Sequence, residues 1–282
     1  MRGPKAAMAG KPTKVLVKRH ALVTRLTHWL NVLVISLLLM SGLQIFNAHP
    51  ALYWGAKSTF AEPWLAMTKE EIGDQPRGIT TVGGLKFDTT GVLGWSGPEG
   101  MREQRGFPSW ATVPSWRDLA TGRNWHFFFA WLFVLNGFVY LAWGLLGGHL
   151  RKDLLPNRDQ LAPGHILHEI STHARLKFAK GEEARRYNVI QKFTYLAVIL
   201  VLLPTMVATG LCMSPGFNAA APWLVDVFGG RQSARSIHFI SAGLIVAFVV
   251  VHLVLVVLSG LWNNMRSMIT GRYAIEVEGG RS

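Results

Sequence analysis

The sequence predicts an all-α membrane protein built as a bundle of four transmembrane helices. Half of its residues are hydrophobic and only 16% are charged, which is too apolar a composition for an ordinary soluble domain. A helix needs roughly 20 mostly apolar residues to cross the hydrocarbon of a membrane. Four stretches meet this requirement, at about residues 26–46, 125–146, 190–213 and 237–262. They are continuously apolar, which favours helices over an alternating β-barrel. We therefore expect one transmembrane domain over residues 1–282.

The distribution of Lys and Arg predicts which ends of the four helices face the cytoplasm. The first 25 residues contain seven Lys or Arg residues and no acid, and the segment between the second and third spans is also rich in bases. The positive-inside rule places both segments, and with them the C-terminal tail, in the cytoplasm. We expect the first span to be the membrane anchor, without a cleaved signal peptide. Anionic membrane lipid accounts for much of the net charge of +13, so we expect no nucleic-acid partner.

The segment 47–122 between the first two spans is predicted to be a long loop on the outer face. It contains TVGGLKFDTTGVLGWSGPEG, and this density of Gly and Pro predicts turns. Tryptophans in it suit the headgroup level of a membrane; they are Trp54, Trp64, Trp95, Trp110 and Trp116. Short amphipathic pieces could lie either on the membrane surface or under a partner protein, and both alternatives stay open.

Four of the ten histidines lie within or at the ends of the predicted spans: His28, His126, His238 and His252. Ionisable residues inside a membrane are rare and are functional candidates by default. The other six lie in loops or tails, where a solvated side chain is the ordinary state; they are His20, His49, His149, His165, His168 and His173. The last three form a small cluster on a short helix-like segment, but no acidic ligand set for a metal is evident beside them.

The spacing of the intramembrane histidines pairs them by depth. His238 and His252 are 14 residues apart on one helix, so they lie about 21 Å apart along its axis and within about 40° of the same face. The antiparallel order of the spans then puts His28 beside His252 near the inner surface, and His126 beside His238 near the outer surface. Two facing imidazoles at each depth can hold two b-type haems. Bis-histidine ligation leaves no open iron site for a substrate, which suits electron transfer.

Residues near these histidines fit such a cofactor. Arg25, Arg123 and Arg235 lie close to the span ends, where a guanidinium can pair with a haem propionate; the basic arm explains Arg25 equally well. Glycines inside the spans allow either close helix packing or room for a flat macrocycle; they are Gly42, Gly137, Gly210 and Gly243. The single cysteine, Cys212, excludes a disulfide framework and a CxxCH haem attachment within the chain.

Motifs in all four spans resemble one known family. RLTHW, GRNWHF, RYNVIQK and IHFISAGLIVAFVVVH occur in this order, and together they are similar to the four-helix di-haem cytochromes b, namely bacterial cytochrome b561, the nickel-iron hydrogenase b-type cytochrome and the gamma subunit of formate dehydrogenase-N. The resemblance implies a bacterial inner-membrane protein with haem ligands at His28, His126, His238 and His252. It also implies a quinone contact at Asn188, followed by Gln191. The alternative for Asn188 is a helix N-cap.

The long outer segment resembles a longer form of the same family. GFPSWATVPSW and the Gly-rich stretch before it are similar to thiosulfate reductase cytochrome b subunits. This resemblance implies a periplasmic molybdopterin oxidoreductase, or another redox subunit, that docks on the outer face.

We therefore predict a membrane-integral di-haem b cytochrome subunit that transfers electrons between the quinone pool and an outer-face redox partner. One alternative is a proton-coupled transporter, but it would need acidic residues within the spans, and the four stretches contain none. A haem-free membrane anchor for a peripheral enzyme is the other alternative. It would explain the long loop but leaves the four intramembrane histidines without a role.

Overall fold

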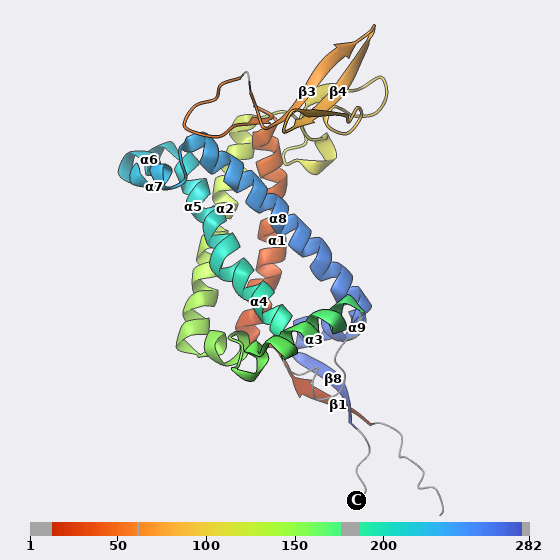
Figure 1. Ribbon diagram of the computed structural model, residues 1–282, viewed down its shortest axis with the longest axis vertical. Coiled ribbons are helices and arrows are strands. Elements are labelled where there is room, and N and C mark those ends of the chain that lie inside the picture. The colour runs from red at the N-terminus through yellow and green to blue at the C-terminus, as the bar shows by residue number, and fades with distance from the viewer. Residues whose placement is uncertain (1–12, 61, 176–186, 278–282) are drawn as a thin grey trace, which may run out of the picture. The chain divides into compact units, whose positions relative to one another are not determined.

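The computed structural model describes residues 13–60, 62–175 and 187–277 (Figure 1). The chain divides into two compact units, which we name by their contents. The termini unit comprises Met1–His28, Val139–Val198 and Phe248–Ser282, and the sheet unit comprises Trp29–Phe138 and Ile199–Ala247. Each of the four long helical stretches contributes one end to the termini unit and the other end to the sheet unit.

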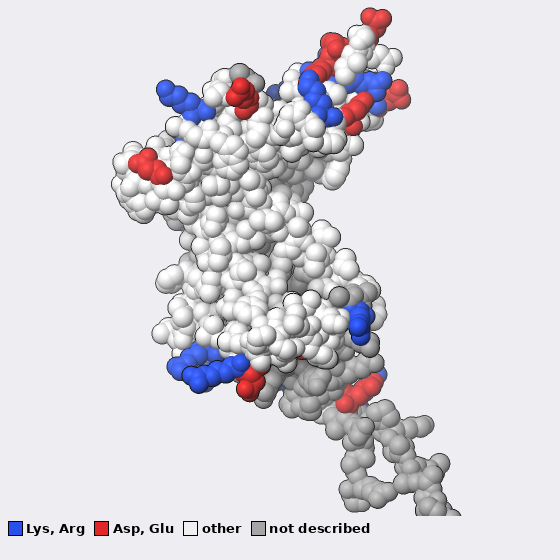
Figure 2. All heavy atoms as spheres, viewed as in Figure 1, with Lys and Arg blue, Asp and Glu red and all other residues white. Residues whose placement is uncertain are grey.

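Within the described residues, four helical stretches are long and apolar enough to cross a membrane, which confirms the predicted spans. They are α1 (Leu22–Phe46), α2 (Leu119–Leu146), the composite stretch Val189–Met213, and α8 (Arg231–Leu258). Helices form here because a backbone in lipid must satisfy its own polar groups. Lys, Arg, Asp and Glu are almost absent from the middle of the molecule on the face that Figure 2 shows, and the apolar side chains of the four stretches suit contact with lipid.

The first, second and fourth stretches begin about four to six residues earlier than predicted. The third and fourth also differ from the prediction of uninterrupted helices, for local reasons. The third stretch consists of α4 (Val189–Ala197), a π-helical turn η5 (Val198–Leu202) and α5 (Leu203–Met213). Pro204 at the start of α5 has no N–H to donate, which accounts for the wider turn before it. The fourth stretch ends at Leu258 instead of Trp262, because Gly260 adopts a left-handed φ of 112°. A separate helix, α9 (Leu261–Thr270), follows it.

The basic N-terminal arm is paired with the C-terminal tail, which the sequence did not predict. Strand β1 (Thr13–Lys18) is antiparallel to β8 (Arg272–Val277). The Arg19 backbone N–H donates to Gly271 O at 2.8 Å, and the Arg19 guanidinium lies 4.4 Å from the centre of the Tyr273 ring. These contacts tie the start of α1 to the end of α9 within the termini unit.

The prediction of an all-α protein is wrong for the segment between α1 and α2. In place of a turn-rich loop with amphipathic pieces, this segment forms a four-stranded antiparallel sheet and a two-stranded one. The strands are β2 (Ala51–Leu52), β3 (Leu65–Ile72), β4 (Gln75–Val82), β5 (Leu85–Asp88), β6 (Gly94–Ser96) and β7 (Glu103–Arg105). The predicted glycine turns are the hairpin connections: Gly83 and Gly84 both have positive φ and join β4 to β5.

A small apolar core and surface ion pairs hold the sheet unit's strands. Leu52, Leu65 and Met67 pack with Phe46 from the end of α1. Lys86 pairs with Glu70 at 2.9 Å on the exposed face, where both signs of charge gather around β3 and β4 (Figure 2). Burial of the apolar faces, rather than exposed ion pairs, provides most of the stabilisation.

The remaining elements are short. They are η1 (Ser109–Ala111), η2 (Leu150–Leu154), η3 (Asp159–Leu161), α3 (Pro163–Ala174), α6 (Pro215–Ala220) and α7 (Trp223–Val227). The helix α3 carries His165, His168 and His173, so the short helix expected for that cluster is confirmed.

Candidate functional site

The structure brings the four intramembrane histidines together as two pairs, each inside one unit. In the termini unit the ring centroids of His28 and His252 lie 6.4 Å apart, and we call these residues the α1–α8 pair. In the sheet unit the centroids of His126 and His238 lie 6.3 Å apart, and we call them the α2–α8 pair. Both pairings match those predicted from depth.

The two separations match what one metal ion between two imidazoles requires. An imidazole nitrogen lies about 2 Å from a first-row metal. The centroid of each ring lies about 1.1 Å beyond its nitrogen. Two rings on opposite sides of one ion therefore have centroids about 6.2 Å apart. Rings in direct stacking contact would be closer. Each pair therefore has the spacing of two axial ligands.

Hydroxyl groups fix the orientation of both rings in the α2–α8 pair. His126 Nδ1 lies 3.1 Å from Ser41 Oγ, and His238 Nδ1 lies 3.0 Å from Thr209 Oγ1. Each hydroxyl already donates its hydrogen to a carbonyl of its own helix at 2.6 Å, so its oxygen accepts from the imidazole. A protonated Nδ1 leaves the lone pair of Nε2 for a metal.

Glycines next to these hydroxyl residues provide the space for the rings. A Cβ at Gly42 would lie 3.3 Å from His126 Cε1, and one at Gly210 would lie 3.4 Å from His238 Cε1. Both rings thus pack against a hydroxyl–glycine pair on a neighbouring helix. The sequence alone does not single out Ser41 and Thr209, although Ser-Gly and Thr-Gly inside two of the spans are a signal for them.

An aromatic ring packs on one member of the α1–α8 pair. His252 stacks on Phe248, one turn earlier on α8, with centroids 5.8 Å apart. Thr27, next to His28, is buried.

Within the sheet unit, the Asn136 side chain donates to Asn31 Oδ1 at 2.8 Å, which links α2 to α1 by a polar contact inside the spans.

The three arginines considered for propionates have different environments. Arg25 donates to Ile269 O at 2.9 Å, so it anchors α9. Arg123 is exposed and lies 5.6 Å from the centre of the Phe127 ring. Arg235 donates to His49 O at 2.6 Å. Propionate binding by these side chains stays a prediction.

Asn188 and Gln191 form a capping box at the start of α4. Asn188 Oδ1 accepts from the Gln191 backbone N–H at 2.8 Å, and Gln191 Oε1 accepts from the Asn188 N–H. This is the N-cap geometry that the sequence left open as the alternative for Asn188. A quinone contact at these residues stays a prediction.

The loop histidines do not gather into a metal site in the part of the chain that the structure describes, which holds no cluster of three or more His, Cys, Asp or Glu residues able to bind an ion. Two of them pair with acids on their own helical turns. His149 Nδ1 lies 2.6 Å from Asp153 Oδ2, and His165 Nε2 lies 3.9 Å from Glu169 Oε1.

Known proteins provide two comparisons. A family model described as prokaryotic cytochrome b561 matches residues 19–271. The putative protein-methionine-sulfoxide reductase subunit YedZ1 of Azospira oryzae is 26% identical over 249 residues, which cover 87% of this chain and 93% of that protein. No solved structure matches the chain significantly.

Proposed function

This chain belongs to the prokaryotic cytochrome b561 family, and we propose that it is a di-haem electron-transfer subunit of a bacterial membrane oxidoreductase. The family binds haem b, and four apolar helices fit a lipid bilayer. The observation that carries the proposal is the pair of imidazole separations, 6.4 and 6.3 Å. Each fits two axial nitrogens on one iron.

Haem b, when bound, supplies one-electron redox chemistry. The protein's contribution is positional and electrostatic. The two histidines of each pair would hold the iron of one haem and would leave no site on it for a substrate. Ser41 and Thr209 contact Nδ1 of their partner rings and so would keep Nε2 directed at the iron.

Two observations support the proposal of a redox partner: the name of the similar protein and the sheets between α1 and α2. The relative from Azospira oryzae is named as a putative subunit of a protein-methionine-sulfoxide reductase. By analogy, this chain would serve a peripheral redox enzyme, for which a periplasmic molybdopterin oxidoreductase is the proposed class. The sheets between α1 and α2 offer such an enzyme a folded surface beside the α2–α8 pair in the sheet unit.

The quinone pool is the proposed second redox partner. In this scheme the termini face the cytoplasm, and quinone reacts beside the α1–α8 pair. The Lys and Arg residues of the N-terminal arm support that orientation.

The test is a reduced-minus-oxidised visible spectrum of the purified full-length chain, with haem counted against protein. We expect two low-spin b haems per chain. An absence of haem would contradict the proposal and leave a haem-free membrane anchor as the function to test.

A further inference from the structure

A pocket of about 270 Å³ lies among the strands of the sheet unit. This volume is just below the usual range of small-molecule sites, so it suits one amino-acid side chain and its neighbours in a peptide. The lining residues are Gln75 and Pro76 at the start of β4, Trp95 in β6, and Gly100 and Arg102 between β6 and β7. The pocket is therefore formed where the four-stranded sheet meets the two-stranded one.

A glycine in β4 lets the Trp95 wall of this pocket approach closely. A Cβ at Gly78 would lie 2.7 Å from the Trp95 backbone nitrogen, so a larger residue there would force the two strands apart. Lys69 Nζ in β3 lies 4.8 Å from the centre of the Trp95 ring, and it is also paired with Glu71 at 2.7 Å. The Trp95 ring is thus held from β3 and β4 as a fixed apolar wall.

Arg102 is the charged residue of the lining, and no described residue compensates its charge by an ion pair. Its Nε is buried and has no hydrogen-bond partner among the described residues. A buried donor of a charged group without an acceptor is destabilising. Three other bases of these strands are paired with acids; the pairs are Arg77–Asp88, Lys86–Glu70 and Arg105–Glu103.

The Arg102 guanidinium lies beside the turn that precedes Trp95. A Cβ at Gly91 would lie 3.9 Å from both Nε and Nη2 of Arg102, and the Gly91 N–H donates to Trp95 O at 2.7 Å. The same turn therefore carries the indole ring and contacts the guanidinium. A guanidinium binds a carboxylate with two parallel hydrogen bonds, and a nearby aromatic ring can pack on the apolar groups that accompany it.

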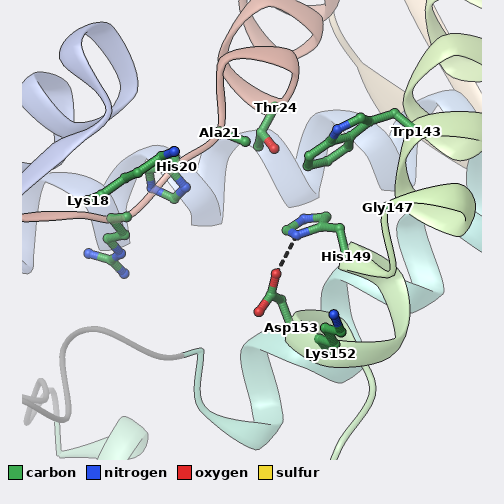
Figure 3. A pocket seen from close by; sticks show the side chains of 10 residues that line it. Lys18, His20, Ala21, Thr24, Trp143, Gly147, His149, Lys152 and Asp153 are labelled. Carbon is green, nitrogen blue, oxygen red and sulfur yellow. Dashed lines mark hydrogen bonds and ion pairs between the residues drawn. The ribbon is translucent and has the colours of Figure 1, made fainter.

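A pocket in the termini unit differs in this respect (Figure 3). Its lining carboxylate, Asp153, is already paired with the His149 ring at 2.6 Å, as the dashed line in Figure 3 marks. In the pocket of the sheet unit, the lining cation has no such partner within the part of the chain that the structure describes. A carboxylate from another protein would supply one.

We propose that the pocket of the sheet unit receives an Asp or Glu side chain from an extended segment of the redox subunit that docks there. The proposal rests on the proposed function, because it names the contact by which that partner is recognised. Arg102 donates to the carboxylate from Nε and one terminal nitrogen, and Trp95 and Pro76 pack against the residues beside it. Arg and Trp are also the residue types that most often dominate the binding energy of an interface.

The charges near the pocket favour a carboxylate over a phosphate. Asp74 directly precedes Gln75 in the chain, Glu99 directly precedes Gly100, and both acids are exposed. They would repel a doubly charged phosphate more strongly than a singly charged carboxylate. The pocket therefore suits an acidic side chain of a protein better than free phosphate or a phospholipid headgroup.

Binding is tested with the purified, haem-loaded full-length chain in phosphatidylcholine nanodiscs. The probe is the peptide Gly-Pro-Glu-Pro-Gly, blocked at both ends so that the Glu carries its only charge, and the matched probe has Gln in place of Glu. Saturation-transfer NMR measures weak complexes, with dissociation constants of about 1 mM. We expect the Gln peptide to bind about tenfold more weakly than the Glu peptide, because it lacks the charge-assisted hydrogen bonds.

Three variants test which side chain holds the peptide. Arg102→Gln should weaken binding of the Glu peptide about tenfold to a hundredfold, since hydrogen bonds to a charged group are lost. Arg102→Lys keeps the charge but not the planar fork, so its loss should be smaller. Arg117→Gln is the matched control, because Arg117 is an exposed arginine of the same unit that donates to Gln104 O at 3.2 Å, outside the pocket. The control should bind as the wild type does.

The outcomes separate this proposal from the proposed function. Equal binding of the two peptides, or binding unaffected by Arg102→Gln, would overturn the proposal. An equal loss in Arg117→Gln would also overturn it, by showing attraction to the overall charge. Displacement of the Glu peptide by an equal concentration of inorganic phosphate would show a site for a free anion instead. Two haems per chain without peptide binding would leave the di-haem subunit intact, whereas a chain without haem would contradict the proposed function itself.

Discussion

At the residue scale, two hydroxyl side chains decide which nitrogen of each ring in the α2–α8 pair faces a ligand. Ser41 and Thr209 each donate within their own helix and accept from a histidine Nδ1. Their positions one residue before Gly42 and Gly210 make this arrangement possible, because the glycine leaves space for the ring beside the hydroxyl. The same device therefore occurs twice, on α1 and on α5.

Replacing Ser41 by Ala should weaken the binding of the haem proposed at the α2–α8 pair about tenfold, as expected when a group that orients a metal ligand is lost. The measurement is haem retention during dilution or competition with apo-myoglobin. Ser36→Ala is the control, because Ser36 is exposed on the same helix and bonds only its own backbone, to Val32 O at 2.7 Å. Equal haem loss in both variants would contradict a specific role for Ser41.

His20 should make the protein less stable in mild acid. Burial, followed by the charge of Arg19, lowers the pKa of His20 from 6.5 to about 4. The unfolded chain therefore binds more protons than the folded protein between these values, and the free energy of unfolding should fall as the pH drops from 6.5 to 4. Thermal unfolding measured over this pH range should show a smaller loss of stability in His20→Gln than in the wild type. Identical slopes in the two proteins would rule out a contribution from His20.

At the element scale, glycines within the helices leave space for the histidine rings, and residues at the helix ends fix where a helix begins or stops. Gly42 and Gly210 let α1 and α5 approach the rings carried by α2 and α8. The Asn188–Gln191 capping box fixes the start of α4, and Gly260 stops α8 before α9 begins. Each of these features is local in the sequence, but the contact that it makes possible involves a second element.

Substituting Val for Gly42 should displace the His126 ring, because even a Cβ there would lie 3.3 Å from His126 Cε1. We expect loss of the haem at the α2–α8 pair with retention of the other, seen as a fall from two haems per chain to about one. Gly216→Val in α6 is the control, since nothing lies within 4 Å of a Cβ at Gly216. Full haem content in Gly42→Val would show that the ring tolerates the added side chain.

Asn188→Leu removes the N-cap of α4 and should cost about 1 kcal/mol of stability. Both haems should remain, because Asn188 and Gln191 are not among the proposed haem ligands. If Asn188 also contacts quinone, electron exchange with menadiol should slow. Unchanged kinetics with the expected loss of stability would restrict Asn188 to its capping role.

At the scale of the whole molecule, each compact unit contains one histidine pair. The termini unit adds the β1–β8 ribbon, and the sheet unit adds the strands between α1 and α2.

Removal of one ligand should therefore affect one haem. His252→Ala should lose the haem of the α1–α8 pair and keep most of the other, and His126→Ala should do the opposite. Redox titration distinguishes them, because each variant should keep a different one of the two midpoint potentials. His165→Gln should keep both haems. Retention of both haems in His252→Ala would contradict the pairing.

Much of this architecture is local in the sequence and was predictable. The lengths of the apolar stretches fix the four spans, and the 14-residue spacing of His238 and His252 puts both on one helical face. The strands between α1 and α2 are not predicted, although one of their signals is present. Gly83 and Gly84 form a hairpin turn, but a density of Gly and Pro is equally typical of a loop. Strand pairing depends on partners elsewhere in the chain, which a turn signal alone does not identify.

The sequence by itself determined the membrane helices and which histidines share a depth, because hydrophobic length and helical period are properties of single segments. The tertiary structure decided what surrounds each histidine. Ser41 meets His126 across 85 positions, Arg25 meets Ile269 across 244, and Tyr187 meets His20 across 167. Such contacts depend on how packed helices are rotated about their axes, and that rotation is set by the whole set of neighbouring side chains rather than by any one segment.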